Sequence, residues 1–245
     1  YCLFKMPASP RTRRTRRSAR QQELVFRTWG GARLGAGRPA GARGPGVPHR
    51  ERAALASRFP VHVTFKARAE VPPLRALRCR AVLRQALRRG CDKPAFRVCH
   101  FSFQNTHVHL LCEALDAQGL GRGLQGLAIR IAKGLNRALG RRGALWADRY
   151  HARILKTPRE VRGALVYVLN NSRHHRLAAR DGFLPTHCVD PLSSAPYFNG
   201  WRERLFWAEA GEPRPVAAPH SWLLAHGWRR HGRISIAEGP APPGA

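Results

Sequence analysis

Apolar and polar positions change with a short period in several parts of the chain, and this pattern predicts β-strands. In residues 61–65 every second residue is apolar, which indicates a strand with one buried face. Two further apolar runs follow, one from Phe96 to Phe103 and one that begins at His107. Only three residues separate these two runs, so we expect them to pair as an antiparallel hairpin. Residues 145–155 are expected to be mainly strand.

Apolar residues recur at helical spacing in three other segments. Residues 74–89 and 122–139 each combine an apolar face with an arginine-bearing face, as amphipathic helices do. A third helix is predicted to open at Thr157-Pro158-Arg159-Glu160 and to run to about Asn171. Threonine as N-cap, proline in the first turn and glutamate three residues after the cap form a capping box.

The predicted order is strand, helix, strand, strand, helix, strand, helix. Its first six elements match a βαββαβ unit, in which an antiparallel sheet carries its helices on one face. We therefore expect an α+β fold of the ferredoxin-like or RRM-like kind, with an additional C-terminal helix that bears Tyr167.

The charge of the chain is strongly positive and unevenly distributed. The formal net charge is +30, from 44 Lys and Arg against 14 Asp and Glu, which indicates a polyanionic partner. Residues 1–57 carry +11 and read as a flexible basic DNA-binding arm, within which Arg33 and Arg38 lie in a glycine-rich stretch suited to phosphates or groove edges. Residues 58–178 carry +18 and hold the periodic structure. Residues 179–245 carry +1 and form a Pro- and Trp-rich extension, whose tryptophans we expect to dock on the core.

The six cysteines contain no Cys-x-x-Cys pair, so reduced thiols are expected rather than disulfides or a zinc cluster. There is no apolar run of 18 residues, and no membrane span is expected. The chain begins with Tyr1 and lacks a recognisable signal peptide, which suggests a fragment or a misassigned start.

Two histidines, His107 and His109, stand one residue apart on the third predicted strand. Side chains alternate along a strand, so both project from one face, about 7 Å apart. Two imidazoles on a rigid strand make half of a metal site. With 12 histidines in 245 residues the spacing also arises by chance, so further ligands are needed. Glu113 lies on the same strand face if the strand stays regular. It is either a metal ligand or a base beside the site, or it has a structural role.

A candidate nucleophile lies on the last predicted helix. Tyr167 flanks its apolar stripe, and Asn171 lies one turn further on the same side. If this side of the helix meets the face bearing His107 and His109, two imidazoles, an amide oxygen and a phenol converge. The alternative is a half-buried aromatic residue between helix and sheet. Tyr150 is a rival nucleophile, less suited because it lies near a strand and has no amide four residues on.

These residues resemble the single-tyrosine HUH transposases, and in particular the REP-associated tyrosine transposases. The resemblance rests on His107-Val108-His109-Leu110-Leu111, on the strand of residues 59–64, on Tyr167-Val168-Leu169-Asn170-Asn171 and on residues 145–151. It covers about residues 25–178 and identifies 58–178 as the catalytic domain. Many members carry proline after the asparagine that follows the tyrosine, whereas Ser172 follows Asn171 here.

The resemblance implies a DNA transposase that cleaves and rejoins single-stranded, hairpin-forming DNA. It implies a divalent ion, Mg²⁺ or Mn²⁺, on His107, His109 and Asn171, and attack by Tyr167 to give a 5′-phosphotyrosine bond. It also implies a cytoplasmic, nucleoid-associated bacterial protein and allows a homodimer. Arg149, Arg153 and Arg173 are further candidates for DNA binding.

Two other interpretations remain open. One is a non-catalytic or domesticated nucleic-acid-binding protein of the same fold, including an RNA-recognition module with Phe101 and Phe103 as stacking residues. The other is a replication initiator or relaxase of the same HUH chemistry. Those proteins often carry two tyrosines on one helix, whereas Tyr167 stands alone on its helix.

Overall fold

The chain is described here from a computed structural model, which describes residues 54–174, 188–205 and 214–239. These residues all belong to one compact unit, residues 45–245. The predicted basic arm, with Arg33 and Arg38, lies outside the described residues, and the proposed division at residues 57 and 178 stays a prediction.

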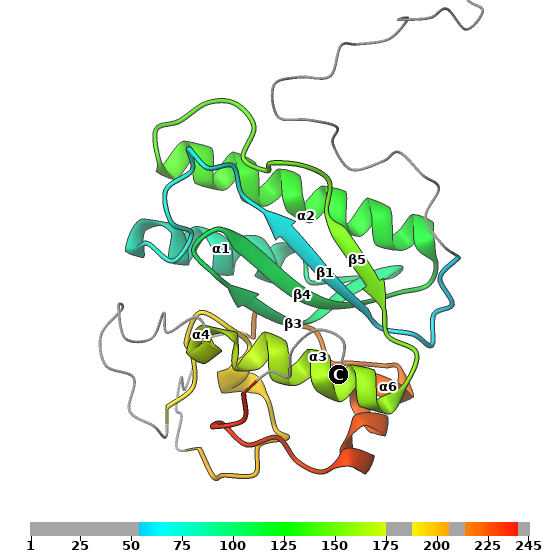
Figure 1. Ribbon diagram of the computed structural model, residues 1–245. Coiled ribbons are helices and arrows are strands. Elements are labelled where there is room, and N and C mark those ends of the chain that lie inside the picture. The colour runs from blue at the N-terminus through cyan, green and yellow to red at the C-terminus, as the bar shows by residue number, and fades with distance from the viewer. Residues whose placement is uncertain (1–53, 175–187, 206–213, 240–245) are drawn as a thin grey trace, which may run out of the picture. The chain divides into compact units, whose positions relative to one another are not determined.

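Five antiparallel strands form one open sheet, in the order β2-β3-β4-β1-β5 (Figure 1). The strands are β1 (Val61–Lys66), β2 (Asp92–Lys93), β3 (Phe96–Phe103), β4 (His107–Ala114) and β5 (His151–Ile154). Without the two-residue β2, the order is that of a βαββαβ sheet, so the predicted α+β class is confirmed. The hairpin of β3 and β4 has the predicted bounds.

The helices cover both faces of the sheet, and Figure 1 shows them in two layers. On one face lie α1 (Leu77–Gly90) and α2 (Ala117–Ala138); we call this the α1/α2 face. The other, the α3 face, is covered by α3 (Pro158–Leu169) and by C-terminal segments. The shorter helices and 3-10 turns are α4 (Asn171–His174), η1 (Ala195–Tyr197), α6 (Trp222–Ala225) and η2 (Gly227–His231).

Several predicted element boundaries differ from the structure. Within the segment predicted as strand over 145–155, regular strand is confined to β5, while residues 145–147 stay beside the end of β1 through an isolated bridge between Ala67 and Trp146. Helix α1 begins at Leu77, three residues after the predicted start. Helix α2 begins five residues before the predicted start, because the Asp116 carboxylate caps it and accepts from the Gly119 amide at 2.6 Å.

The apolar core is divided by the sheet. The cluster on the α1/α2 face contains Phe101 and Phe103, which are 1% and 0% exposed. These rings cannot stack on bases, so the RNA-module interpretation loses its aromatic platform. The cluster on the α3 face joins α3 to Leu111 of β4 and to the C-terminal residues.

The C-terminal extension packs on this core. Trp201 and Trp228 are buried, which confirms their expected docking, whereas Trp222 is half exposed. Phe206 and Trp207 lie outside the described residues. A buried ion pair between Arg75, just before α1, and Asp190 also ties the extension to the sheet unit.

The cysteines and the helices bear on the expectations about disulfides and membrane spans. Their five cysteines are free, and four of these are buried. None of the described helices has both the length and the apolar character that crossing a membrane requires.

Candidate active site

The α3 face carries a group of histidines near its centre. His107 and His109 project from β4, and the centroids of their rings are 5.5 Å apart. His109 is 3% exposed, and His107 is half-buried. The predicted common orientation of the two imidazoles is therefore present.

Threonine hydroxyls hold both imidazoles. Thr64 of β1 lies opposite His109 in the sheet, and its Oγ1 is 3.1 Å from His109 Nδ1. The Thr106 Oγ1 is 2.6 Å from His107 Nδ1. A hydroxyl that accepts from Nδ1–H selects the tautomer whose lone pair is on Nε2. Metal-binding histidines commonly have a hydrogen bond of this kind on the nitrogen that does not bind the metal.

A third histidine, His62, completes the group. It neighbours Thr64 on β1, and its ring centroid is 5.5 Å from that of His109. Burial, and then the positive charge of Arg153, lower the pKa of His62 to about 4, so the ring is neutral at physiological pH. Its buried Nε2 has no hydrogen-bond partner among the described residues. The sequence alone favoured a core hydrogen bond for His62 over a place lining the site, although the alternation of β1 already puts it on the face opposite Val61 and Val63.

Tyr167 comes over these histidines. Its ring centroid lies 5.1 Å from that of His109, with the rings nearly perpendicular at 87°, and 5.6 Å from that of His62. The capping box predicted at Thr157 is present and sets the start of α3. Helix and sheet thus bring together residues about 60 positions apart in the sequence, as the active-site hypothesis requires.

Tyr150 lies on the opposite face of the sheet. Its ring is 5.6 Å from that of Phe65 and packs against the apolar cluster under α1 and α2. A Cβ added to Gly121 of α2 would lie 4.0 Å from the Tyr150 hydroxyl. The rival phenol is therefore separated from His107 and His109 by the sheet.

Asn171 is fully buried, but it does not share an unbroken helix with Tyr167. Helix α3 ends at Leu169, two residues short of the prediction, because Asn170 forms its C-cap. Asn171 begins the short helix α4, and both polar atoms of its amide are buried without a hydrogen-bond partner among the described residues. Such an orphaned amide is expensive to bury, which fits a group whose partner is a ligand.

The side chains of this site match the usual ligands of divalent metal ions only in part. Within the described ranges, no group of three or more His, Cys, Asp and Glu side chains is placed to hold a metal. If one ion took all three side chains, His107 and His109 would supply two nitrogens and the buried Asn171 amide would supply an oxygen. Two imidazoles with an oxygen donor suit Mn²⁺ better than Mg²⁺, which prefers oxygen ligands.

The arginines predicted to bind DNA are placed unequally. Arg153 of β5 lies opposite His62, is exposed, and reaches Glu160 at 3.2 Å. Arg149 is exposed just before β5. Arg173 belongs to α4, and its side chain is outside the described residues, as are Arg33 and Arg38. The α3 face also carries Lys66, opposite His107, a cation that sequence reasoning did not single out.

Glu113 has a structural role. Its carboxylate accepts from the backbone N–H groups of His220 and Ser221, at 2.8 and 2.9 Å, and from the Ser221 hydroxyl at 2.7 Å. Three donors from the C-terminal extension therefore occupy the group that shares a strand face with His107 and His109.

The C-terminal extension also holds α3 at both ends. Near the helix start, Arg162 forms a bidentate ion pair with Glu238. At the helix end, the Asn170 amide donates to the carbonyls of Ser235 and Glu238, at 3.0 and 2.8 Å. These contacts fix the helix that carries Tyr167, and nothing in the local sequence of α3 indicated them.

Comparisons with known proteins give matches among solved structures. No family model matches the chain, and a search of curated proteins found no match. A solved structure described as the REP-associated tyrosine transposase bound to a REP hairpin aligns with a TM-score of 0.45 and 16% identity, over 60% of this chain and 82% of that chain.

Proposed function

We propose that this chain is a metal-dependent DNA strand transferase, a transposase of the single-tyrosine HUH kind. The observation that carries the proposal is the position of the Tyr167 ring, edge-on to His109 at 5.1 Å on the face where His107 also projects. The excess of basic residues supports a DNA substrate.

In this mechanism His107 and His109, with the Asn171 amide as third ligand, would hold a divalent ion. A bound ion would supply Lewis-acid polarisation of the scissile phosphate and would offset the charge that develops on it. His62 is neutral because its pKa is lowered to about 4, so it adds no positive charge that would repel the ion. The Thr64 and Thr106 hydroxyls keep the two ligating rings in place.

Tyr167 supplies the nucleophile. Its phenolic oxygen forms a bond to phosphorus and gives up its proton, while the bond from phosphorus to the 3′ oxygen breaks and that oxygen takes up a proton. The product is a 5′-phosphotyrosine and a free 3′-hydroxyl. A 3′-hydroxyl then reverses the same exchange to rejoin DNA, so no external energy source is needed. Arg153 and Lys66 line the approach of the DNA backbone on the α3 face.

The test compares Tyr167→Phe with Tyr150→Phe in the full chain. Each protein is incubated with labelled single-stranded hairpin oligonucleotides and Mn²⁺, and covalent adducts are separated on a denaturing gel. We expect Tyr150→Phe to retain the adduct and Tyr167→Phe to lose it while still binding DNA. An adduct that survives in Tyr167→Phe would reassign the nucleophile. DNA binding by the wild type with no adduct on any hairpin would select the non-catalytic alternative.

We further propose that Tyr167 acts on a phosphate held by its own chain, which the 5.1 Å between the Tyr167 and His109 rings supports. Mixing Tyr167→Phe with His109→Ala tests this, because each variant lacks a different half of the site. Restored cleavage in the mixture would show that the tyrosine serves a partner subunit, and we expect none.

A further inference from the structure

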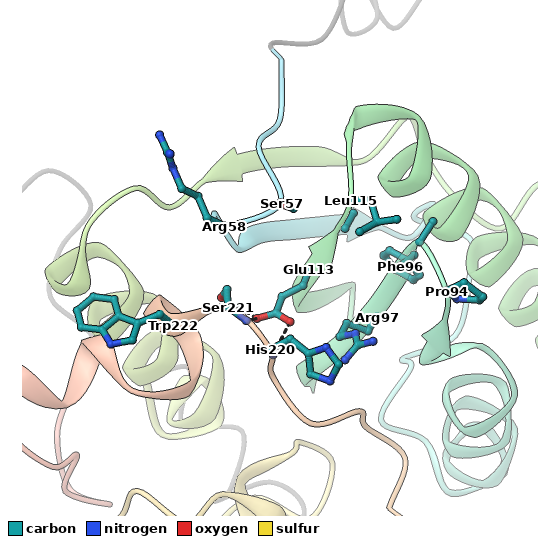
Figure 2. Close-up of a pocket in the computed structure, with 12 residues that line it drawn as sticks. Ser57, Arg58, Pro94, Phe96, Arg97, Glu113, Leu115, His220, Ser221 and Trp222 are labelled. Carbon is teal, nitrogen blue, oxygen red and sulfur yellow. Dashed lines mark hydrogen bonds between the residues drawn. The ribbon is translucent and has the colours of Figure 1, made fainter.

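A cavity of about 450 Å³ opens at the far end of β4 from His107. It is bordered by residues just before β1, by the facing ends of β3 and β4, and by the start of α6 (Figure 2). Glu113 lines it and projects from the same strand face as His109, four residues on. At roughly 3.3 Å per residue this is about 13 Å from His109 along the strand. A volume of this size is in the range of small-ligand sites.

The walls of the cavity expose unusual apolar surface. Four large hydrophobic side chains are exposed in the described part of the chain, and two of them, Leu115 and Trp222, line this cavity. They are 60% and 49% exposed. Figure 2 shows Phe96 and Leu115 on one side and Trp222 on the other. Exposed apolar surface gathered in a concave site indicates a binding role.

The charge accessible in the cavity is positive. Arg58 and Arg97 line it, and its one carboxylate, Glu113, is engaged by the three donors from His220 and Ser221. The Asp92 partner of Arg97 is exposed and 3.6 Å away, so water and salt screen that pair. A ligand suited to these walls combines a flat apolar ring with an anionic group.

We propose that the cavity holds one unpaired nucleotide of the substrate strand, with its base on the face of Trp222 that the Arg230 guanidinium leaves open and its phosphate on Arg58, which Figure 2 draws on the same side as Trp222. This inference rests on the proposed function, and it takes the strand over His109 to run on past the end of β4. A nucleotide held about 13 Å from the scissile phosphate sets the register of cleavage. The cavity thus selects substrates in which this nucleotide is not base-paired.

Photo-cross-linking of the full-length protein tests the position of the strand. Hairpin oligonucleotides carry a single 5-iodouracil at successive positions on either side of the cleavage point, and cross-linked peptides are identified by mass spectrometry. We expect one position to cross-link to the peptide that contains Trp222. Cross-links spread over all positions, or none on this peptide, would overturn the inference.

Binding measurements with matched variants provide a second test. Loss of base stacking in Trp222→Ala is expected to weaken single-strand binding about 5- to 100-fold, whereas Trp222→Phe retains most of the affinity. Leu77→Ala, which removes an exposed hydrophobic side chain on α1, is the control and should change nothing. Equal affinities for Trp222→Ala and Leu77→Ala would refute the site.

The salt dependence of binding separates a phosphate contact from general charge. Arg58→Ala is expected to reduce the slope of log affinity against log salt concentration by about one. Arg78→Ala, which removes an exposed arginine side chain of α1, should leave the slope unchanged. Equal slopes for both variants would remove Arg58 from the site. A Trp222 cross-link without any Tyr167 adduct would refute the proposed chemistry and keep the cavity, whereas an adduct without the cross-link would do the reverse.

Discussion

The ion pair of Arg75 and Asp190 allows a quantitative prediction about the C-terminal extension. The Asp190 carboxylate accepts two bonds from the Arg75 guanidinium, at 2.8 and 3.1 Å, and the two side chains are 3% and 1% exposed. Arg75 also donates to the Phe103 carbonyl at 2.9 Å. The pair therefore links the start of α1, the end of β3 and the extension.

Asp190→Asn keeps the size of the side chain and removes its charge. The Arg75 guanidinium is then buried without a counter-ion, and removal of one partner from such a pair typically costs about 3–5 kcal/mol. Domains unfold with a free energy of about 5–15 kcal/mol, so this single atom exchange is expected to remove about a fifth of the stability or more. Glu70→Gln breaks the exposed pair of Arg68 and Glu70 and should cost less than about 1 kcal/mol.

Urea unfolding followed by tryptophan fluorescence measures both changes, because Trp201 and Trp228 are buried in the extension. We expect a large fall in the urea midpoint for Asp190→Asn and almost none for Glu70→Gln. The double variant Arg75→Met with Asp190→Leu should recover much of the loss, because no unpaired charge remains. If Asp190→Asn were no more destabilising than Glu70→Gln, the burial of this pair would not govern the docking of the extension.

Three further outcomes are expected. Burial lowers the pKa of His100 to about 4, so the unfolded chain takes up a proton that the folded chain resists; stability is full above pH 6.5 and falls by up to about 3 kcal/mol towards pH 4. His100→Asn should make this acid limb shallower in urea titrations, while the part due to His62, whose pKa is also lowered to about 4, remains; an unchanged limb would contradict the assignment. In α2, Gly123→Ala places a Cβ 2.1 Å from the Phe96 ring of β3 and should lower the free energy of unfolding by about 1–3 kcal/mol. Gly126→Ala meets no atom within 4 Å and should raise it by about 1 kcal/mol. Equal thermal unfolding midpoints for the two variants would refute this packing. Thr64→Val removes the hydroxyl at His109 Nδ1 and should weaken Mn²⁺ binding about 10- to 100-fold in calorimetry, with unchanged affinity as the contrary result.

Local signals predicted the parts of the fold that local interactions determine. The start of α3 was predicted to the residue, because the capping box involves only Thr157, Glu160 and their backbone. The hairpin of β3 and β4 followed from two apolar runs and a short turn. The start of α2 was missed, because Gly119 and Gly123 interrupt the apolar period there. Gly119 lies against Ala95, just before β3, and Gly123 lies against Phe96 of β3, which is a tertiary reason for their presence.

The candidate site shows the same division. The spacing of His107 and His109 was visible in the sequence, and so was the position of Tyr167 beside an apolar helical stripe. The role of His62 depends on the register of β1 against β4, and the fixation of α3 by Glu238 joins residues 76 positions apart. The periodicity of apolar residues along the sequence does not reveal partners at such separations, so only the folded structure shows them.

The attachment of α3 to the extension has a consequence for how this protein is made. Arg162 leaves the ribosome 76 residues before Glu238. At usual rates of synthesis, about 5–20 residues per second, about 4 to 15 seconds pass between the synthesis of Arg162 and that of Glu238. During that interval the helix that carries Tyr167 lacks its contacts to Glu238, so under the proposed function we expect the nascent chain to gain DNA binding before it gains cleavage.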